Sequence, residues 1–354
     1  LGAPVGSAFH GAAMDAPGYM SRLLVDQNHA ALSGDCLLLR KALFLEAGGF
    51  DVEPKLARWA AVDLCLRLQQ AGYLNVWTPR AYLMMDMPAQ PAASVEEEDA
   101  MFQRWLPLLA RDPSYNAGFA LGGDQGYTLG DPVQAWRPLQ GWQPVPSLLA
   151  HPGDLHGCGH YRVIQPFNAL RAEGALDGSM SLTLLDVPSL ERYQPDIILL
   201  QRQLGDQRLE AMRRYQAFSR AFKVYELDDY LPGVPMKSIH RQHFVSSDMT
   251  RYLRRGLSYV DRFVVSTEPL AEALGHLHSE VRVMRNCLDP LWWGDLKSER
   301  RVSAKPRVGW AGGSSHTGDL ELIADVVKEL ANEVEWVFYG MCPEKLRPYV
   351  HEFH

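Results

Sequence analysis

The chain has 354 residues, of which 47% are hydrophobic and 22% are charged, a balance typical of globular domains. A net charge of −7 gives no overall basic surface for nucleic acid or anionic lipid, although a local patch is compatible with it. The five cysteines are well separated and form no CxxC pair, which argues against a zinc site or a disulfide framework and favours free thiols in the cytoplasm. No apolar run is long enough to span a membrane.

The first 110 residues contain several short predicted elements. Residues 31–47 predict a turn at Ser33-Gly34, a short strand and a helix. Apolar spacing predicts a helix over residues 62–71 that ends at Gly72, followed by a strand over 73–78. The acidic run Glu96-Glu97-Glu98-Asp99 precedes a helical pattern, and we expect it to be a solvated helix start.

Two stretches of this segment carry a family resemblance. SGDCLLLRKALFLEAGGFD and VDLCLRLQQAGYLNVWTPRAYL resemble the second half of a family 2 glycosyltransferase, which has the GT-A fold. RWLPLLARDPSYN is similar to the tail that follows this module in bacterial polysaccharide enzymes. The match covers about residues 11–116, so we expect residues 1–130 to be the C-terminal part of a GT-A-like module.

Departures from the family pattern predict that this module is inactive. Ala60-Ala61 stand where the family has its acidic pair, and Asp63 corresponds to a second acid that orients the helix. Met84 and Met85 stand near the place of a metal-binding histidine, and a thioether is a poor ligand for Mg²⁺ or Mn²⁺. The nucleotide-binding half of the module would precede Leu1. Asp35 and Asp51 are expected to be turn residues.

A proline-rich stretch follows. Residues 129–148 read LGDPVQAWRPLQGWQPVPSL, in which four prolines and two glycines break any regular element. We therefore expect an interdomain linker over residues 131–147.

Strands alternate with helices from residue 147 onward, which predicts a parallel α/β sheet with helices on both faces. Strands are expected at residues 147–150, 181–185, 196–200, 222–227, 262–265 and 281–284. Helices are expected at residues 161–172, 206–218, 247–259 and 269–277. Ligands of such sheets bind beyond the carboxyl ends of the strands, and the loops there (HGCGHYR, QRQ, ELDDYLPG, STEP and RNCLD) are rich in polar groups.

The last stretch predicts a strand, a glycine turn and a helix. Residues 307–311 form the strand, Gly312-Gly313 the turn, and a helical pattern continues to Leu330, followed by a strand over 334–339 and a helix over 343–353. The glycines allow close approach of a phosphate, and free N–H groups at a helix start bind one. The alternative is a tight turn whose serines only cap the helix.

The second half of the chain resembles a GT-B glycosyltransferase of the family 4 kind. The similar stretches are GCGHYRVIQPFNAL, KVYELDDYLP, RVMRNCLDP and RVGWAGGSSHTGDL, in the order of that family. The resemblance implies an acceptor domain over residues 148–300 and the start of a nucleotide-sugar domain over 301–354, whose remainder would follow His354. The expected fold class is α/β: a GT-A tail, then Rossmann-like doubly wound parallel sheets, the last one truncated.

The resemblance also implies roles for individual residues. The catalytic candidates are Asp228 and Asp229. Because consecutive residues at a strand end point to opposite sides, we expect only one of them to face the interdomain cleft. The resemblance favours Asp228, which corresponds to the family's strand-end position. The donor-binding candidates are Gly312, Gly313, Ser314, Ser315, His316 and Asn286. The substrate-binding candidates are Gly157, Gly159, His160, Arg162 and Glu226, with Arg162 expected to bind an anionic group.

Structural alternatives exist for these candidates. The two aspartates could cap a loop or pair with Arg202 or Arg241, and His160 and Arg162 could be surface residues of a helix start. Asn286 could only fix a hinge. His316 could be a simple helix-entry residue.

The implied function is transfer of a sugar from a UDP-, GDP- or dTDP-sugar to a glycan or lipid-linked glycan in bacterial surface polysaccharide synthesis, of the O-antigen (lipopolysaccharide) or capsule type. The resemblance implies that the GT-B part needs no metal and no tightly bound cofactor. We expect no nucleic-acid partner, and we expect the missing parts of the parent chain to be partners. The expected location is the cytoplasm at the inner face of the membrane, where peripheral association is allowed. The alternative is a non-catalytic glycan-binding or assembly module. A nucleotide-binding dehydrogenase ranks low because no GxGxxG turn is present.

Overall fold

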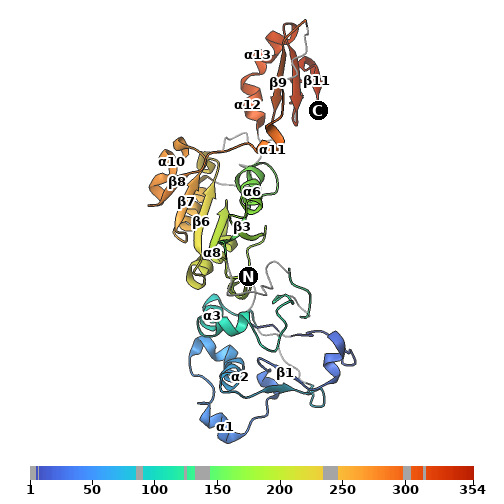
Figure 1. Ribbon diagram of the computed structural model, residues 1–354, viewed down its shortest axis with the longest axis vertical. Helices are drawn as coiled ribbons and strands as arrows, with labels where there is room; N and C mark the ends of the chain where they lie inside the picture. Colours follow the sequence, from blue (N-terminus) through green and yellow to red (C-terminus); the bar gives the residue numbers. More distant parts are fainter. Residues whose placement is uncertain are drawn as a thin grey trace. The chain divides into compact units, whose positions relative to one another are not determined.

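The computed structural model describes residues 5–6, 8–84, 91–122, 126–131, 144–233, 246–297, 304–313 and 316–354 (Figure 1). These residues form three sheets: two antiparallel strands, six parallel strands and three parallel strands. The expected α/β class is therefore confirmed, and the six-stranded sheet is consistent with a Rossmann-like fold.

The N-terminal segment contains small helices around a two-stranded ribbon. Its strands β1 (Gln27–His29) and β2 (Asn75–Trp77) pair antiparallel. Its α-helices are α1 (Lys41–Glu46), α2 (Ala60–Gln70) and α3 (Val95–Ala110). Two apolar clusters hold it together, one of Leu56, Leu66, Met101 and Trp105 and one of Leu43, Leu64 and Leu68.

The six-stranded sheet has the order β4-β3-β5-β6-β7-β8. Its strands are β3 (Ser147–His151), β4 (Asp177–Met180), β5 (Ile197–Gln201), β6 (Phe222–Leu227), β7 (Arg262–Val265) and β8 (Val281–Val283). The helices between them are α5 (Gly157–Gly159), α6 (Gln165–Ala172), α7 (Val187–Tyr193), α8 (Asp206–Phe218), α9 (Ser246–Leu257) and α10 (Glu268–Leu274). The chain runs outward from β3 to β4 and then returns past β3 to β5. The strand order therefore reverses beside β3, at a topological switch point.

Three expectations for this sheet are wrong. The strand expected at residues 181–185 lies earlier, at Asp177–Met180, and an unexpected helix, α7, follows it. Gly178 makes the earlier strand possible, since a Cβ there would lie 1.9 Å from the Leu148 carbonyl oxygen. The helix expected from residue 161 begins at Gly157, and its second turn, His160–Ile164, has π geometry.

The three-stranded sheet has the order β11-β10-β9, with β9 at Arg307–Ala311, β10 at Glu335–Tyr339 and β11 at Glu352–Phe353. The expected helix over residues 317–330 is interrupted at Ile323, giving α12 (Thr317–Leu322) and α13 (Ala324–Glu329). The expected helix over residues 343–353 is wrong. That stretch forms a 3₁₀ turn at Arg347–Tyr349 and then β11, because prolines interrupt helical bonding and β10 offers a free edge.

The chain divides into two compact units. Unit 1 comprises Leu1–Pro152, Phe167–Leu200 and Glu210–Val224; unit 2 comprises Gly153–Pro166, Gln201–Leu209 and Tyr225–His354. Unit 1 thus joins the N-terminal segment to part of the six-stranded sheet, and unit 2 holds the loops at the carboxyl ends of β3, β5 and β6. The expected boundaries at residues 130, 147 and 300 stay predictions, and most of the predicted linker lies outside the described residues.

Within unit 1, the acidic start of α3 is not merely solvated. Ser94 and Glu97 form a capping box, as a helix start requires. Glu98 pairs with the buried guanidinium of Arg214 at 2.7 Å, and Asp99 lies 3.1 Å from the same side chain. Arg213 reaches Asp99 at 2.5 Å. The expectation of a solvated run is therefore wrong, because α8 supplies two arginines to it.

Apolar and backbone contacts reinforce this junction between α3 and the helices of the sheet. The rings of Phe102 and Phe218 meet edge to face with centroids 5.6 Å apart, and Leu106 packs in the same cluster with Val187. The buried Arg192 of α7 donates to the carbonyl oxygen of Ala110 at 2.9 Å. The N-terminal segment and the sheet thus share a packed interface inside unit 1.

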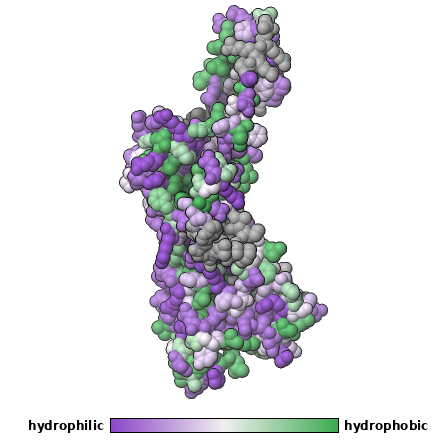
Figure 2. Space-filling view, viewed as in Figure 1, coloured by the Kyte–Doolittle hydropathy of each residue, from purple (hydrophilic) through white to green (hydrophobic). Residues whose placement is uncertain are grey.

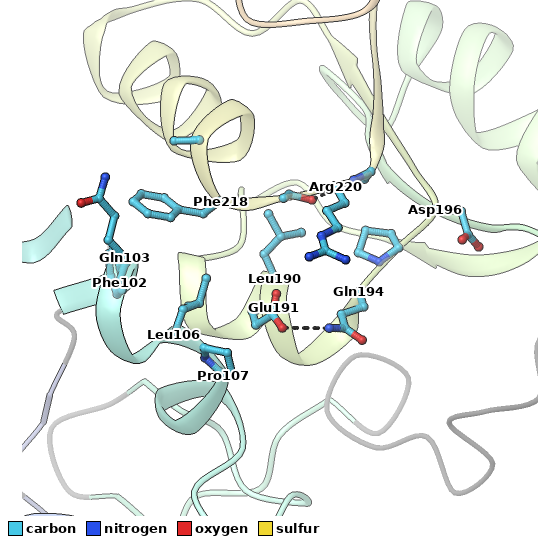
Figure 3. A pocket seen from close by; sticks show the side chains of 14 residues that line it. Phe102, Gln103, Leu106, Pro107, Leu190, Glu191, Gln194, Asp196, Phe218 and Arg220 are labelled. Carbon is cyan, nitrogen blue, oxygen red and sulfur yellow. Dashed lines mark hydrogen bonds between the residues drawn. The ribbon is translucent and has the colours of Figure 1, made fainter. Parts of the chain in front are cut away.

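A groove of about 780 Å³ opens in unit 1 beside α3 and α7, at the amino ends of β5 and β6. Leu106, Leu190 and Phe218 contribute apolar walls, and Arg220 and Gln194 contribute polar groups (Figure 3). Because ligands of parallel sheets bind at the opposite ends of the strands, this groove is not where the sequence predicts the site.

The face drawn in Figure 2 mixes hydrophilic and hydrophobic residues. Among the residues that the structure describes, no helix has both the length and the apolar character needed to cross a membrane.

Candidate functional site

The candidate site lies where β3, β5 and β6 end, beside the switch point of the six-stranded sheet. The loop after β3 supplies Asp154 and Cys158, the end of β5 supplies Arg202, and the end of β6 supplies Glu226, Asp228 and Asp229. All of these residues belong to unit 2.

The loop after β3 is shaped by Asp154 and Gly159. The Asp154 carboxylate accepts hydrogen bonds from the backbone N–H groups of His156 at 2.9 Å and Gly159 at 3.1 Å. A Cβ at position 159 would lie 1.8 Å from the Asp154 carbonyl oxygen, so only glycine fits there. A Cβ at Gly157 would meet no atom within 4 Å, and Gly157 and His160 are exposed. Gly159 is thus required by the fold, whereas Gly157 and His160 are open to a ligand.

Arg162, Glu226 and Asn286 come together in the interior. The Arg162 side chain is 2% exposed, and its Nε donates to Glu226 Oε1 at 2.6 Å. Its Nη1 donates to Asn286 Oδ1 at 2.9 Å and to the Met284 carbonyl oxygen. Burial raises the pKa of Glu226, and the charge of Arg162 opposes that rise. Arg162 thus fastens three segments to one another and is not a surface residue of a helix start.

Asp228, Asp229 and Cys158 form a second cluster, in which one atom of each side chain lies within 4.8 Å of the others. Arg202 approaches Asp228 with its Nε at 3.8 Å and also pairs with Asp154. The two aspartates therefore face the same cluster, and the expectation that they point to opposite sides is wrong. The strand ends at Leu227 and the chain bends at Asp229, so the alternation of a strand no longer applies.

The two aspartates differ in environment. The Asp228 side chain is 8% exposed and lies against Arg202, as the structural alternative anticipated. Asp229 is exposed, and partial burial of its carboxylate together with the negative charge of Asp228 raises its pKa. Burial and a hydrogen bond to Asp228 raise the pKa of the Cys158 thiol to about 12.

Cys158 should therefore react slowly with iodoacetamide at pH 8, since the thiolate is the nucleophile. The Asp228→Asn variant should react faster, because loss of the negative charge lowers the pKa of the thiol. The rate can be followed by peptide mass spectrometry with the exposed Cys36 as internal reference. An unchanged rate in the variant would show that Asp228 does not act on this thiol.

Cys158, Asp228 and Asp229 also offer three candidate metal ligands. A thiol must lose its proton to bind a metal, and both burial and Asp228 hold that proton in place. The nearby guanidinium of Arg202 would repel a cation. Without a bound cation, the raised pKa keeps the Cys158 thiol protonated at neutral pH.

The predicted donor-binding turn lies on the three-stranded sheet, at the end of β9. A Cβ at Gly313 would meet no atom within 4 Å, whereas one at Gly312 would lie 2.7 Å from the ring of Trp310. His316 is exposed and its Nδ1 lies 2.8 Å from the Asp319 carboxylate. Ser314 and Ser315 lie outside the described residues. Space beside Gly313 is thus open for a ligand.

The acids of the N-terminal segment have internal partners. Asp63 is fully buried and accepts hydrogen bonds from Arg67 at 2.9 Å, Arg104 at 3.0 Å and Trp105 at 2.9 Å. Asp51 accepts the backbone N–H of Glu53, as a turn residue does, and pairs with Arg104 at 2.5 Å. Met84 is exposed, and Met85 lies outside the described residues.

Three residues of the site, Asp154, Cys158 and Arg202, were not predicted to be functional from the sequence. Asp154 and Cys158 lie in the polar loop after β3, so their position at the end of a strand could have identified them as candidates. Arg202 has a φ of +47°, a left-handed conformation that aims it at the two aspartates. Nothing in the residue order of QRQ reveals that conformation, which is uncommon for a side chain larger than glycine.

One stretch of the chain is similar to a known protein. No family model matches the chain. Over 113 residues it is 35% identical to "Uncharacterized protein y4gI" of Sinorhizobium fredii (strain NBRC 101917 / NGR234). The match covers 29% of this chain and spans only 12% of that protein's length. This similarity carries no functional assignment.

Proposed function

We propose that this chain is part of a glycosyltransferase that moves a sugar from a nucleotide sugar to a glycan acceptor, as its family 2 and family 4 resemblances imply. The observation that carries the proposal is the pair Asp228 and Asp229 beside Arg202, at the carboxyl end of β6 near a switch point. A carboxylate there can accept the proton of an attacking hydroxyl, and ligands of parallel sheets bind at this edge.

Of the two carboxylates, Asp229 is the better candidate for the general base. It is exposed and has a raised pKa, which brings it closer to the pKa of an efficient base at neutral pH. Asp228 is almost buried between Arg202 and Cys158, so it is placed to position and polarise the site. The sequence-based preference for Asp228 thus gives way to the geometry.

The donor would bind at the turn after β9. The backbone at Gly313 can approach a diphosphate closely, because the residue has no side chain and even a Cβ there would meet no atom within 4 Å. This arrangement needs no metal ion. Asp228 and Asp229 follow a strand of the six-stranded sheet and Gly313 follows a strand of the three-stranded sheet, as separate acceptor and nucleotide-sugar domains would require. The donor candidate Asn286 instead lies beside Arg162, after the last strand of the six-stranded sheet.

A second candidate function is a non-catalytic glycan-binding or assembly module. Ala60-Ala61 replace the acids of the family 2 pattern, and the remaining Asp63 is fully committed to internal hydrogen bonds. These observations favour a scaffolding role for the N-terminal segment, whichever function the rest of the chain has.

A thermal shift screen of the 354-residue chain against UDP, GDP, dTDP and their sugars tests the proposed function. One nucleotide class should raise the melting temperature, because a ligand that binds only the folded state stabilises it. Gly313→Val should abolish that shift, since its side chain fills the open space. Gly275→Val is the matched control, because a Cβ there also meets no atom within 4 Å. A chain that responds to no nucleotide but binds glycans would support the second candidate function.

The N-terminal segment should contribute no metal-dependent nucleotide site. We expect Mn²⁺ to leave the affinity of the chain for any nucleotide sugar unchanged in calorimetric titration, because Ala60-Ala61 stand where the family 2 pattern has its acids and Asp63 is engaged in internal hydrogen bonds. Micromolar binding that requires Mn²⁺ would contradict an inactive GT-A-like module.

A further inference from the structure

We infer that the carboxyl edge of the six-stranded sheet takes an acceptor that bears no negative charge, namely a neutral or amino-substituted polyhydroxyl group. This inference rests on the proposed function and adds the chemical class of the acceptor. It also departs from the sequence-based expectation that Arg162 binds an anion.

Both arginines that the structure describes in this site are held by groups of the protein. Arg162 is buried: its Nε and Nη1 donate to Glu226, Asn286 and the Met284 carbonyl oxygen, and its Nη2, which has no hydrogen-bond partner among the described residues, is buried as well. Arg202 is engaged by Asp154 and lies 3.8 Å from Asp228. To reach a guanidinium, an anionic acceptor would have to displace a carboxylate or open the buried side chain of Arg162.

The charges of the site do not balance. Among the residues that the structure describes at this edge, the four carboxylates of Asp154, Glu226, Asp228 and Asp229 stand against the guanidinium groups of Arg162 and Arg202, an excess of two negative charges. Cys158 adds no charge at neutral pH, because the pKa of its thiol is raised to about 12. A cleft with an excess of one sign repels ligands of that sign and concentrates ligands of the other.

The exposed group of the cluster is Asp229, so a ligand meets a carboxylate first. A carboxylate accepts hydrogen bonds from hydroxyl and ammonium groups and donates none when ionised. The neighbouring Asp228 already raises the pKa of Asp229 by repulsion between like charges, with burial as the larger cause. A uronate or phosphate placed here would add a further negative charge to that repulsion.

Cys158 provides a local reporter, because its sulfur lies within 4.8 Å of the aspartate oxygens and its side chain is partly accessible. Rates of modification by a cationic and an anionic methanethiosulfonate reagent of similar size are measured at Cys158 and at the exposed Cys36. Slow reaction caused by the raised thiol pKa affects both reagents alike, so the ratio of rates reports the local potential.

At Cys158 the cationic reagent should react faster than the anionic one. This ratio of rates should exceed the same ratio at Cys36 by at least about tenfold, as expected for a charged cleft. Asp229→Asn should reduce this preference. A ratio equal to that of Cys36, or a preference for the anionic reagent, would overturn the inference.

Protection of Cys158 by methyl glycosides completes the test. Neutral or amino glycosides should slow its modification by an uncharged methanethiosulfonate reagent, and uronate glycosides should not. Equal or better protection by uronates would overturn the inference even if the reagent ratio holds. Absence of protection by any glycoside, with the reagent ratio as expected, would instead count against the proposed function and leave the charge of the cleft established.

Discussion

Arg214→Ala is expected to destabilise the chain by about 3 kcal/mol, the lower end of the range for removing one partner of a buried charge pair. The Arg214 side chain is 1% exposed and is the shared partner of Glu98, Asp99 and Glu210. Its guanidinium also lies 5.4 Å from the centre of the Phe102 ring. Alanine would leave three like charges close together, remove this packing and loosen α3 from α8.

Urea unfolding monitored by circular dichroism measures the loss of stability, and hydrogen exchange shows where it occurs. Amides of α3 and α8 should lose protection together in Arg214→Ala. Arg251→Ala is the matched control, because Arg251 is 65% exposed and its partner Asp248 is 48% exposed, so the change should stay within about 0.5 kcal/mol. If α8 kept its protection while α3 lost it, the N-terminal segment would be an independent module and not part of the same folding unit.

The elements predicted most accurately from the sequence are those with an uninterrupted apolar pattern. The strands β6 and β7 and the helix α8 have the predicted bounds, because buried parallel strands and an amphipathic helix carry their burial pattern in the residue order. The strand β9 also has the predicted bounds, although its residues are exposed or half-buried at a sheet edge. The edge strand β4 was missed because its residues, DGSM, are mostly small or polar. An edge strand needs less apolar surface than a central one, so its position depends on its neighbour β3.

The location of the candidate site was also predictable, since the polar loops at the strand ends were visible in the sequence. The partners of each side chain were not. Arg162 looked like a surface residue with an anion to bind, yet it lies buried against Glu226, 64 residues away. The acidic run of α3 looked solvated, yet its partners are 116 residues away on α8. Such pairings arise only when the chain has folded, so spacing along the sequence cannot reveal them.

Asp229→Asn is expected to lower the turnover of the proposed transfer reaction by about 10²-fold or more, the low end for loss of a general base. Asparagine keeps the size of the side chain and cannot accept the acceptor proton. The affinity for the donor should change little, because the proposed donor-binding turn after β9 lies on another sheet. Turnover is measured as nucleotide released from the donor that binds, with circular dichroism as the check on folding.

The pH dependence separates the roles of the two aspartates. A base works when deprotonated, and the pKa of Asp229 is raised by burial and by the charge of Asp228. Turnover should therefore rise with pH through a value above the ordinary range of aspartate. Asp228→Asn removes the repelling charge and lowers the pKa of Asp229, so the rise should move to lower pH. Loss of turnover in Asp228→Asn with full activity in Asp229→Asn would exchange the two roles. Full activity in both variants would make the aspartates loop caps and favour the non-catalytic glycan-binding module.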